Sequence, residues 1–182
     1  MEARTWSDTR VLDRWGRDAL EHPAMLALTW YQWFKAFHVL AAVVWVGGGA
    51  TLTILAFLTV REKDPVRLAQ FAKQAGWVGE RIYTPASLAV LALGFGLIEN
   101  GQSPWSYDLT WVQIGLAGWA ASTALGIFYI GPTAKKLGKM VEERGPADPE
   151  AQTTIKRVLL VARLDVLLLL FIVFDMTAKP WS

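Results

Sequence analysis

Five ionisable side chains interrupt the apolar stretches of this sequence: Lys35, His38, Arg163, Asp165 and Asp175. Ionisable groups are costly inside a membrane, so each is a candidate for function. His38 is the sharpest candidate, because a neutral imidazole can bind haem iron or copper and can also carry a proton. The bland alternative is a histidine that only hydrogen-bonds a neighbouring helix. Lys35 stands near the end of its stretch, where its stem can reach water.

His38 lies in a nearly uncharged stretch, Trp33 to Thr59, that is long enough to cross a bilayer as a helix. Residues three and four apart form one stripe of that helix: Lys35, His38, Ala42, Trp45, Gly49, Leu52 and Ala56. The histidine therefore faces the same way as Trp45 and a notch formed by glycines 47–49. This stripe indicates a helix that packs against partners and could hold a ligand.

The two aspartates share a stripe of the last apolar stretch with Leu168, Ile172 and Lys179. Asp175 and Lys179 are four apart, which makes an ion pair geometrically plausible. If the first helix descends and the last one returns, His38 and Asp175 occupy the same leaflet. We therefore expect Asp175 to orient the His38 ring or to accept its proton. Arg163 and Asp165 are two apart and point in different directions.

The side chains available as ligands favour haem over copper. The chain has two His and four Met, and only His38 and Met176 are expected to be close together, which is thin for a copper site. Haem needs one or two axial ligands, a glycine-lined gap and aromatic walls. The chain can offer these, although a second axial ligand is not obvious.

Composition places the chain among integral membrane proteins. Its 182 residues suit one domain, 53% of them are hydrophobic and only 19% are charged, and the apolar residues come in blocks. A net charge of +2 is too small to indicate a nucleic-acid partner. The absence of cysteine excludes disulfides, thiolate metal sites and Fe–S clusters. No hydrolase or nucleotide-binding motif is present, and the N-terminal residues lack the apolar core of a cleavable signal.

The pattern predicts an all-α fold, a four-helix transmembrane bundle with an N-terminal amphipathic interfacial helix. Residues 1–30 form that surface helix and residues 31–182 the bundle, with spans at about 31–60, 78–99, 109–131 and 155–178. Residues 66–82 are a second interfacial segment or a polar extension of the second helix. Gly118, Ser122 and Gly126 are spaced for close helix packing in lipid. Residues 140–154 are expected to be a loop.

Basic residues orient the bundle. They gather in the segments after the first and third helices, and the loop between the second and third helices has none. Trp105, Tyr107 and Trp111 form an aromatic belt at the membrane face of that loop. The positive-inside rule therefore predicts a multi-pass protein of the cell membrane with both termini on the non-cytoplasmic side.

Several short motifs resemble known families. Lys35-Ala36-Phe37-His38, followed by Trp45 and Gly48, resembles the first helix of HemJ-type protoporphyrinogen oxidases. The run from His38 to Gly48 also resembles the CopD copper-resistance membrane domain. Pro85-Ala86 with Gly94, and Arg163 to Asp165 with Lys179-Pro180, resemble the second and last HemJ helices. The resemblance spans about 31–181, and the whole is similar to an uncharacterised family of predicted integral membrane proteins related to both.

The resemblance implies a four-helix bundle with b-type haem at His38. Trp45 and Gly48 would contact the cofactor, and Lys35, Asp165 and Asp175 would be the catalytic groups. The chain departs from the HemJ pattern at Gly115, which stands about where those proteins carry a lysine. This departure favours the scaffold and a haem site over protoporphyrinogen oxidation itself.

Three functions follow from the sequence. The first is a membrane-embedded haem protein in redox or electron transfer, which would be an oxidoreductase. The second is a cofactor-free accessory or structural subunit of a membrane complex, whose partners are other membrane subunits or further copies of the chain. The third is CopD-like copper handling. All three place the protein in the lipid bilayer.

Overall fold

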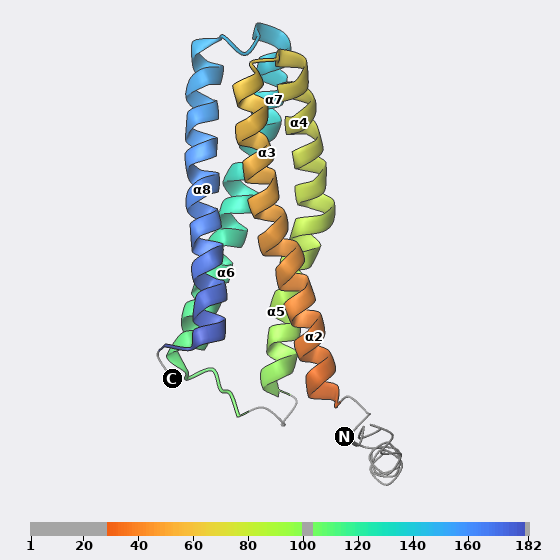
Figure 1. The fold of residues 1–182 in the computed structure, drawn as a ribbon, viewed down its shortest axis with the longest axis vertical. Coiled ribbons are helices and arrows are strands. Elements are labelled where there is room, and N and C mark those ends of the chain that lie inside the picture. The colour runs from red at the N-terminus through yellow and green to blue at the C-terminus, as the bar shows by residue number, and fades with distance from the viewer. Residues whose placement is uncertain (1–28, 100–103, 181–182) are drawn as a thin grey trace, which may run out of the picture.

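The computed structural model describes residues 29–99 and 104–180, and this part of the chain forms four long helical rods without a strand (Figure 1). The predicted interfacial helix falls almost wholly on residues 1–28, outside the described part. The first rod is α2 (Trp30–Ala42), η2 (Val43–Gly47) and α3 (Gly48–Glu62), and the second is α4 (Pro65–Val78), η3 (Gly79–Tyr83) and α5 (Thr84–Glu99). The third is α6 (Thr110–Ala124), η4 (Leu125–Ile130) and α7 (Gly131–Arg144), and the fourth is α8 (Pro149–Ala178). The segments η2, η3 and η4 are wide, π-helical turns.

Side-chain caps set where the rods begin. The Asp64 carboxylate accepts a hydrogen bond from the Val66 amide at 2.9 Å, and Asp148 accepts from the Glu150 and Ala151 amides at 3.0 Å each. Each aspartate precedes a proline, which suits the first turn of a helix. The predicted start of the second helix at 78 and of the fourth at 155 are therefore wrong. The helices begin at Pro65 and Pro149, and residues 66–82 are the polar extension of the second helix.

Two prolines lie inside rods because a wide turn precedes each of them. Pro85 follows η3 and Pro132 follows η4. A proline ring clashes with the carbonyl four residues earlier, here that of Arg81 or Phe128, and both carbonyls belong to a wide turn. The Thr84 hydroxyl also donates to the Gly79 carbonyl at 3.0 Å. The prediction that the third helix ends near 131 was wrong for this reason: it continues to Arg144, into the first residues of the expected loop.

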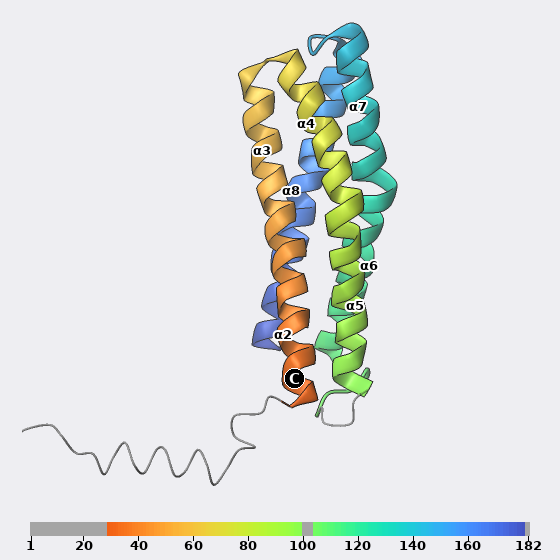
Figure 2. The same ribbon diagram turned by 90° about the vertical axis from the view of Figure 1, so that its right-hand side faces the viewer.

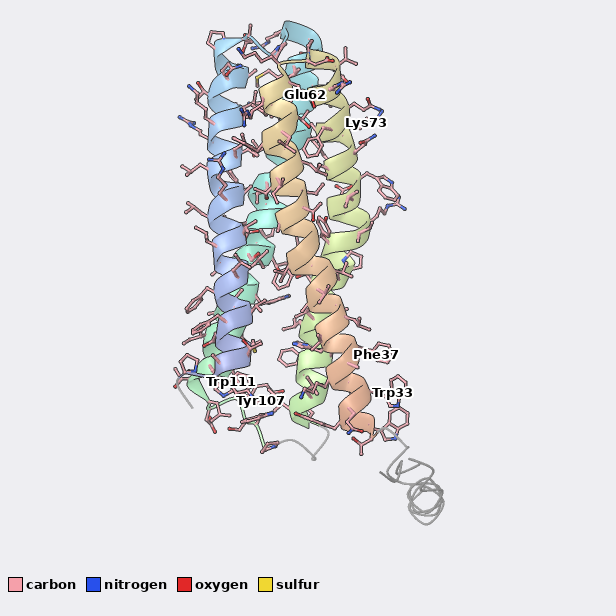
Figure 3. All side chains as sticks on the ribbon, viewed as in Figure 1. Trp33, Phe37, Glu62, Lys73, Tyr107 and Trp111 are labelled. Atoms are coloured by element: carbon pink, nitrogen blue, oxygen red, sulfur yellow. The ribbon has the colours of Figure 1, made fainter. Side chains whose placement is uncertain are left out.

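Three of the rods are long and apolar enough to cross a membrane: Trp30–Glu62, Pro65–Glu99 and Thr110–Arg144. Many of their large apolar side chains are exposed, and side chains surround the whole bundle in Figure 3. The fourth rod, α8, carries Arg163, Asp165 and Asp175 in its apolar half, and its crossing remains a prediction. It runs beside α3 and α6 (Figure 1).

The helices also pack together at the end of the bundle that carries Glu62 and Lys73, which we call the basic end (Figure 3). There α4 packs along α7 and the start of α8, and the buried residues form one apolar cluster: Leu68, Ala69, Leu137, Met140, Val141, Ala151 and Ile155. Rods of 33 to 35 residues are about 50 Å long, against a hydrocarbon core of about 30 Å. We infer that this end lies outside the hydrocarbon layer, because it has a buried apolar core and a charged surface, as soluble proteins do.

The two ends of the described chain lie at one end of the bundle (Figures 1 and 2). Trp33, Tyr107 and Trp111 lie at this aromatic end, and Glu62 and Lys73 lie at the opposite, basic end (Figure 3). The Tyr107 hydroxyl donates to the Glu99 carboxylate at 2.8 Å, and this hydrogen bond raises the pKa of Tyr107.

Small residues allow α6 to approach α8 closely. A Cβ atom at Gly118 would lie 2.7 Å from Ile172 Cγ1, and one at Gly115 would lie 1.9 Å from Met176 Cε. Gly115, Gly118 and Ser122 are all buried. The predicted small-residue contact is confirmed for Gly118 and Ser122. It does not extend to Gly126, where a Cβ would meet nothing within 4 Å.

Gly118→Val should loosen this contact. The new side chain must displace Ile172, which overpacks the interface and costs about 1–3 kcal/mol. Thermal unfolding of the detergent-purified protein should show a lower midpoint. Gly126→Ala on the same rod is the matched control and should unfold no earlier than wild type. Equal midpoints for Gly118→Val and wild type would show that this close approach does not form.

The predicted orientation can be tested with single thiols, because the chain has no cysteine. Ser106 is exposed at the aromatic end and Ala147 is exposed at the basic end. A membrane-impermeant maleimide should label Ser106→Cys in intact cells, and Ala147→Cys only after the membrane is opened. The reverse pattern would invert the topology.

Candidate functional site: the His38 notch and the central cavity

His38 is fixed by a backbone carbonyl of the neighbouring helix. Its Nδ1 atom lies 2.9 Å from the Val90 oxygen in α5. A carbonyl can only accept, so Nδ1 carries the proton, and in the neutral ring Nε2 keeps its lone pair. Within residues 29–99 and 104–180, Nε2 makes no hydrogen bond. The ring is therefore held in the tautomer that leaves Nε2 available to a ligand.

Glycines of α5 make the room for this ring. A Cβ atom at Gly94 would lie 3.3 Å from His38 Cε1, and one at Gly96 would lie 2.7 Å from the Phe34 ring. The notch at His38 is thus built by Gly94 in the partner helix. Sequence reasoning placed it in glycines 47–49 of the histidine's own helix.

Trp45 and Gly48 lie farther along the first rod. Trp45 is 8% exposed and packs against Leu169 and Ile172 of α8. A Cβ atom at Gly48 would lie 2.3 Å from the Tyr83 ring, so the space at Gly48 is filled by a side chain of η3. Lys35 is exposed near the aromatic end, as expected for a stem that reaches water.

A cavity of about 640 Å³ lies between the four rods and is partly open. All three wide turns contribute to its wall, through Trp45 of η2, Tyr83 of η3 and Ile127 of η4. Wide turns of this kind recur at functional sites. The volume lies in the range that takes small ligands. His38 is not among the residues that line it, so the histidine and the cavity are two separate places.

Hydroxyl groups line one wall of the cavity. Ser87 and Thr123 share a hydrogen bond of 2.7 Å between α5 and α6, and the Trp119 indole donates to the Ser87 carbonyl at 3.0 Å. Sequence spacing did not predict Ser87, Thr123 or Tyr83 as site residues. Each is a common side chain on an apolar helix, and only the fold brings them together.

Asp165 brings a carboxylate to the cavity. It is hydrogen-bonded to Ser122, and its Oδ1 atom is buried without a hydrogen-bond partner in the described chain. At the rim Lys135 pairs with Glu80, and both side chains are half exposed. Of the two aspartates predicted as site residues, Asp165 is therefore the one that lines the cavity.

Asp175 lies elsewhere. It is fully buried in α8, at 0% exposure, and does not line the cavity. The His38 hydrogen bond that we expected from Asp175 is made by Val90 instead. Lys179, one turn further, places its ammonium 3.6 Å from the Trp105 ring centre and 5.1 Å from that of Trp111.

The donor set gives copper little support. Residues 29–99 and 104–180 contain no group of three or more His, Cys, Asp or Glu side chains that could hold a metal ion. Met176, the expected second ligand, packs on Gly115 of α6, whereas His38 is bonded to α5.

The fold and these buried ionisable groups define a multi-pass α-helical membrane protein. The chain belongs to the family described as "Predicted integral membrane protein (DUF2269)", whose model matches residues 32–180. It is also similar to a protein named protoporphyrinogen IX oxidase from Synechocystis sp., with 32% identity over 116 residues that cover 60% of this chain and 53% of the relative. The chain thus spans about half the length of that curated relative. No solved structure matches. The predicted relation to an uncharacterised membrane family and to HemJ-type proteins is confirmed.

A single thiol can report whether water enters the cavity. Gly126 lines it with free space around its Cβ position, and Gly47, in η2, is exposed with free space as well but does not line it. Thiols react as thiolates, which need water. A water-soluble methanethiosulfonate reagent should therefore modify Gly126→Cys much faster than Gly47→Cys. Equal rates would mean that the cavity is dry or filled by lipid.

Proposed function

We propose that this protein binds b-type haem through His38 Nε2 and serves in electron transfer or another redox reaction in the membrane. The hydrogen bond between His38 Nδ1 and the Val90 carbonyl carries the proposal. Histidines that ligate metals typically donate their other ring N–H to a carbonyl or carboxylate, which fixes the ring and raises its basicity. His38 has this arrangement already.

The notch fits a histidine that would hold haem iron. Gly94 lets the ring lie against α5, and the one donor that haem iron requires is present. Haem, when bound, would supply a one-electron couple. The name of the Synechocystis relative describes an enzyme that acts on a tetrapyrrole precursor, which supports a tetrapyrrole beside this helix.

The other residues divide their roles by position. His38 holds the group and Gly94 positions the ring. Trp45, two helical turns further on the same stripe, packs the first rod against α8. Asp165 can take up or release a proton at Oδ1 in the cavity, whereas Asp175 is packed too deeply to exchange protons readily.

An absorption spectrum tests the proposal. Protein purified from cells supplied with haem should show a Soret band and b-type peaks on dithionite reduction. His38→Ala should lose both, because it removes the nitrogen that would hold the iron. A colourless wild type would refute the haem proposal and favour the function as an accessory subunit.

A matched pair of glycine variants separates ligation from folding. Gly94→Val should lower the haem content severalfold, since its side chain pushes the His38 ring out of its notch. Gly47→Val adds the same side chain to the first rod, where a Cβ meets nothing within 4 Å, and should keep the wild-type content. Equal haem content in both variants would argue against the notch as the site.

A further inference from the structure

The central cavity holds a partly buried carboxyl group, that of Asp165, without a positive partner among the described residues. The titratable side chains that line it are Glu80, Tyr83, Lys135 and Asp165. Lys135 is paired with Glu80 at the rim. Arg163, two residues from Asp165, is directed away, with its guanidinium 5.1 Å from the Phe57 ring centre and exposed. In the described chain Asp165 has Ser122 as its hydrogen-bond partner and no ion pair.

A buried carboxylate in this setting demands compensation. A charge inside a bundle costs several kcal/mol unless it is paired or fully hydrogen-bonded. The single hydrogen bond with Ser122 does not offset that cost. Either a proton or a cation must neutralise it. The cavity is large enough for an organic cation, and most of its wall is apolar.

The walls fit the same kind of ligand. Trp45, Phe71 and Tyr83 come from two different rods and all line the cavity. Aromatic faces attract cations, more strongly when the site excludes water. An anion would meet the Asp165 carboxylate as a like charge, and a neutral apolar molecule would leave it uncompensated.

We propose that the cavity between the four rods binds an apolar organic cation whose charge lies against Asp165. This site is separate from the His38 notch and does not depend on haem. The cation enters past the Glu80–Lys135 pair, the half-exposed polar part of the wall, and displaces the water or lipid that otherwise fills the space.

The test uses two ions of equal shape and opposite charge, tetraphenylphosphonium and tetraphenylborate, with the full-length protein in detergent. Equilibrium dialysis should show saturable binding of tetraphenylphosphonium alone. Asp165→Asn should raise its dissociation constant at least tenfold, which corresponds to about 1.4 kcal/mol. Glu150→Gln removes the same charge from the exposed start of α8 and should leave the constant unchanged.

A second variant guards against misfolding of Asp165→Asn. Gly126→Phe fills the cavity from the third rod, where a Cβ has free space, and leaves Asp165 in place. It should also abolish tetraphenylphosphonium binding while keeping the wild-type unfolding midpoint. The proposal is overturned if tetraphenylborate binds as well as tetraphenylphosphonium does. It is also overturned if folded Asp165→Asn or Gly126→Phe binds tetraphenylphosphonium as wild type does.

Discussion

An α-helix that contains a proline must leave room at the carbonyl four residues earlier, and this requirement at Pro85 and Pro132 shapes the centre of the bundle. Both rods meet it with a wide turn, η3 and η4, directly before the proline. A wide turn adds a residue to one turn of the helix, so the side chains after it are rotated relative to those before it. The rods therefore pack through one face near the aromatic end and another near the basic end, and the cavity lies where the faces change.

The two packing zones on either side of this change are stabilised differently. At the basic end, burial of Leu137, Val141 and Ile155 removes apolar surface from water, which is the usual driving force in soluble proteins. Inside lipid that force is absent, and helices associate through close van der Waals contact. The contacts of Gly118 with Ile172 and of Gly48 with Tyr83 are of this second kind.

Sequence periodicity predicted the helices but not the cavity between them. The stripe through His38 and Trp45 was predicted from spacing, and Trp45 is indeed buried in a contact with α8. The partner of His38 was wrong, because a main-chain carbonyl such as that of Val90 has no signature in the sequence. The cavity was missed because a period of 3.6 residues carried across η3 or η4 assigns the following residues to the wrong face. The boundaries at Pro65 and Pro149 could have been predicted, since Asp64 and Asp148 each precede a proline in a capping position.

His38 and the cavity stay distinct along one stripe of the first rod. Trp45 is seven residues from His38, about 10 Å along the axis, and it belongs to the cavity wall. The same helix face thus carries a candidate ligand for a metal-centred group at one level and the aromatic wall of a carboxylate-bearing chamber at the next. Trp45 also packs on Leu169, which lies one helical turn from Asp165. A group bound at His38 would sense the charge state of Asp165 across a low-dielectric interior, where Coulomb interactions are strong. Charge at Asp165, set by a proton or by a bound cation, would therefore shift the energy of adding an electron beside His38.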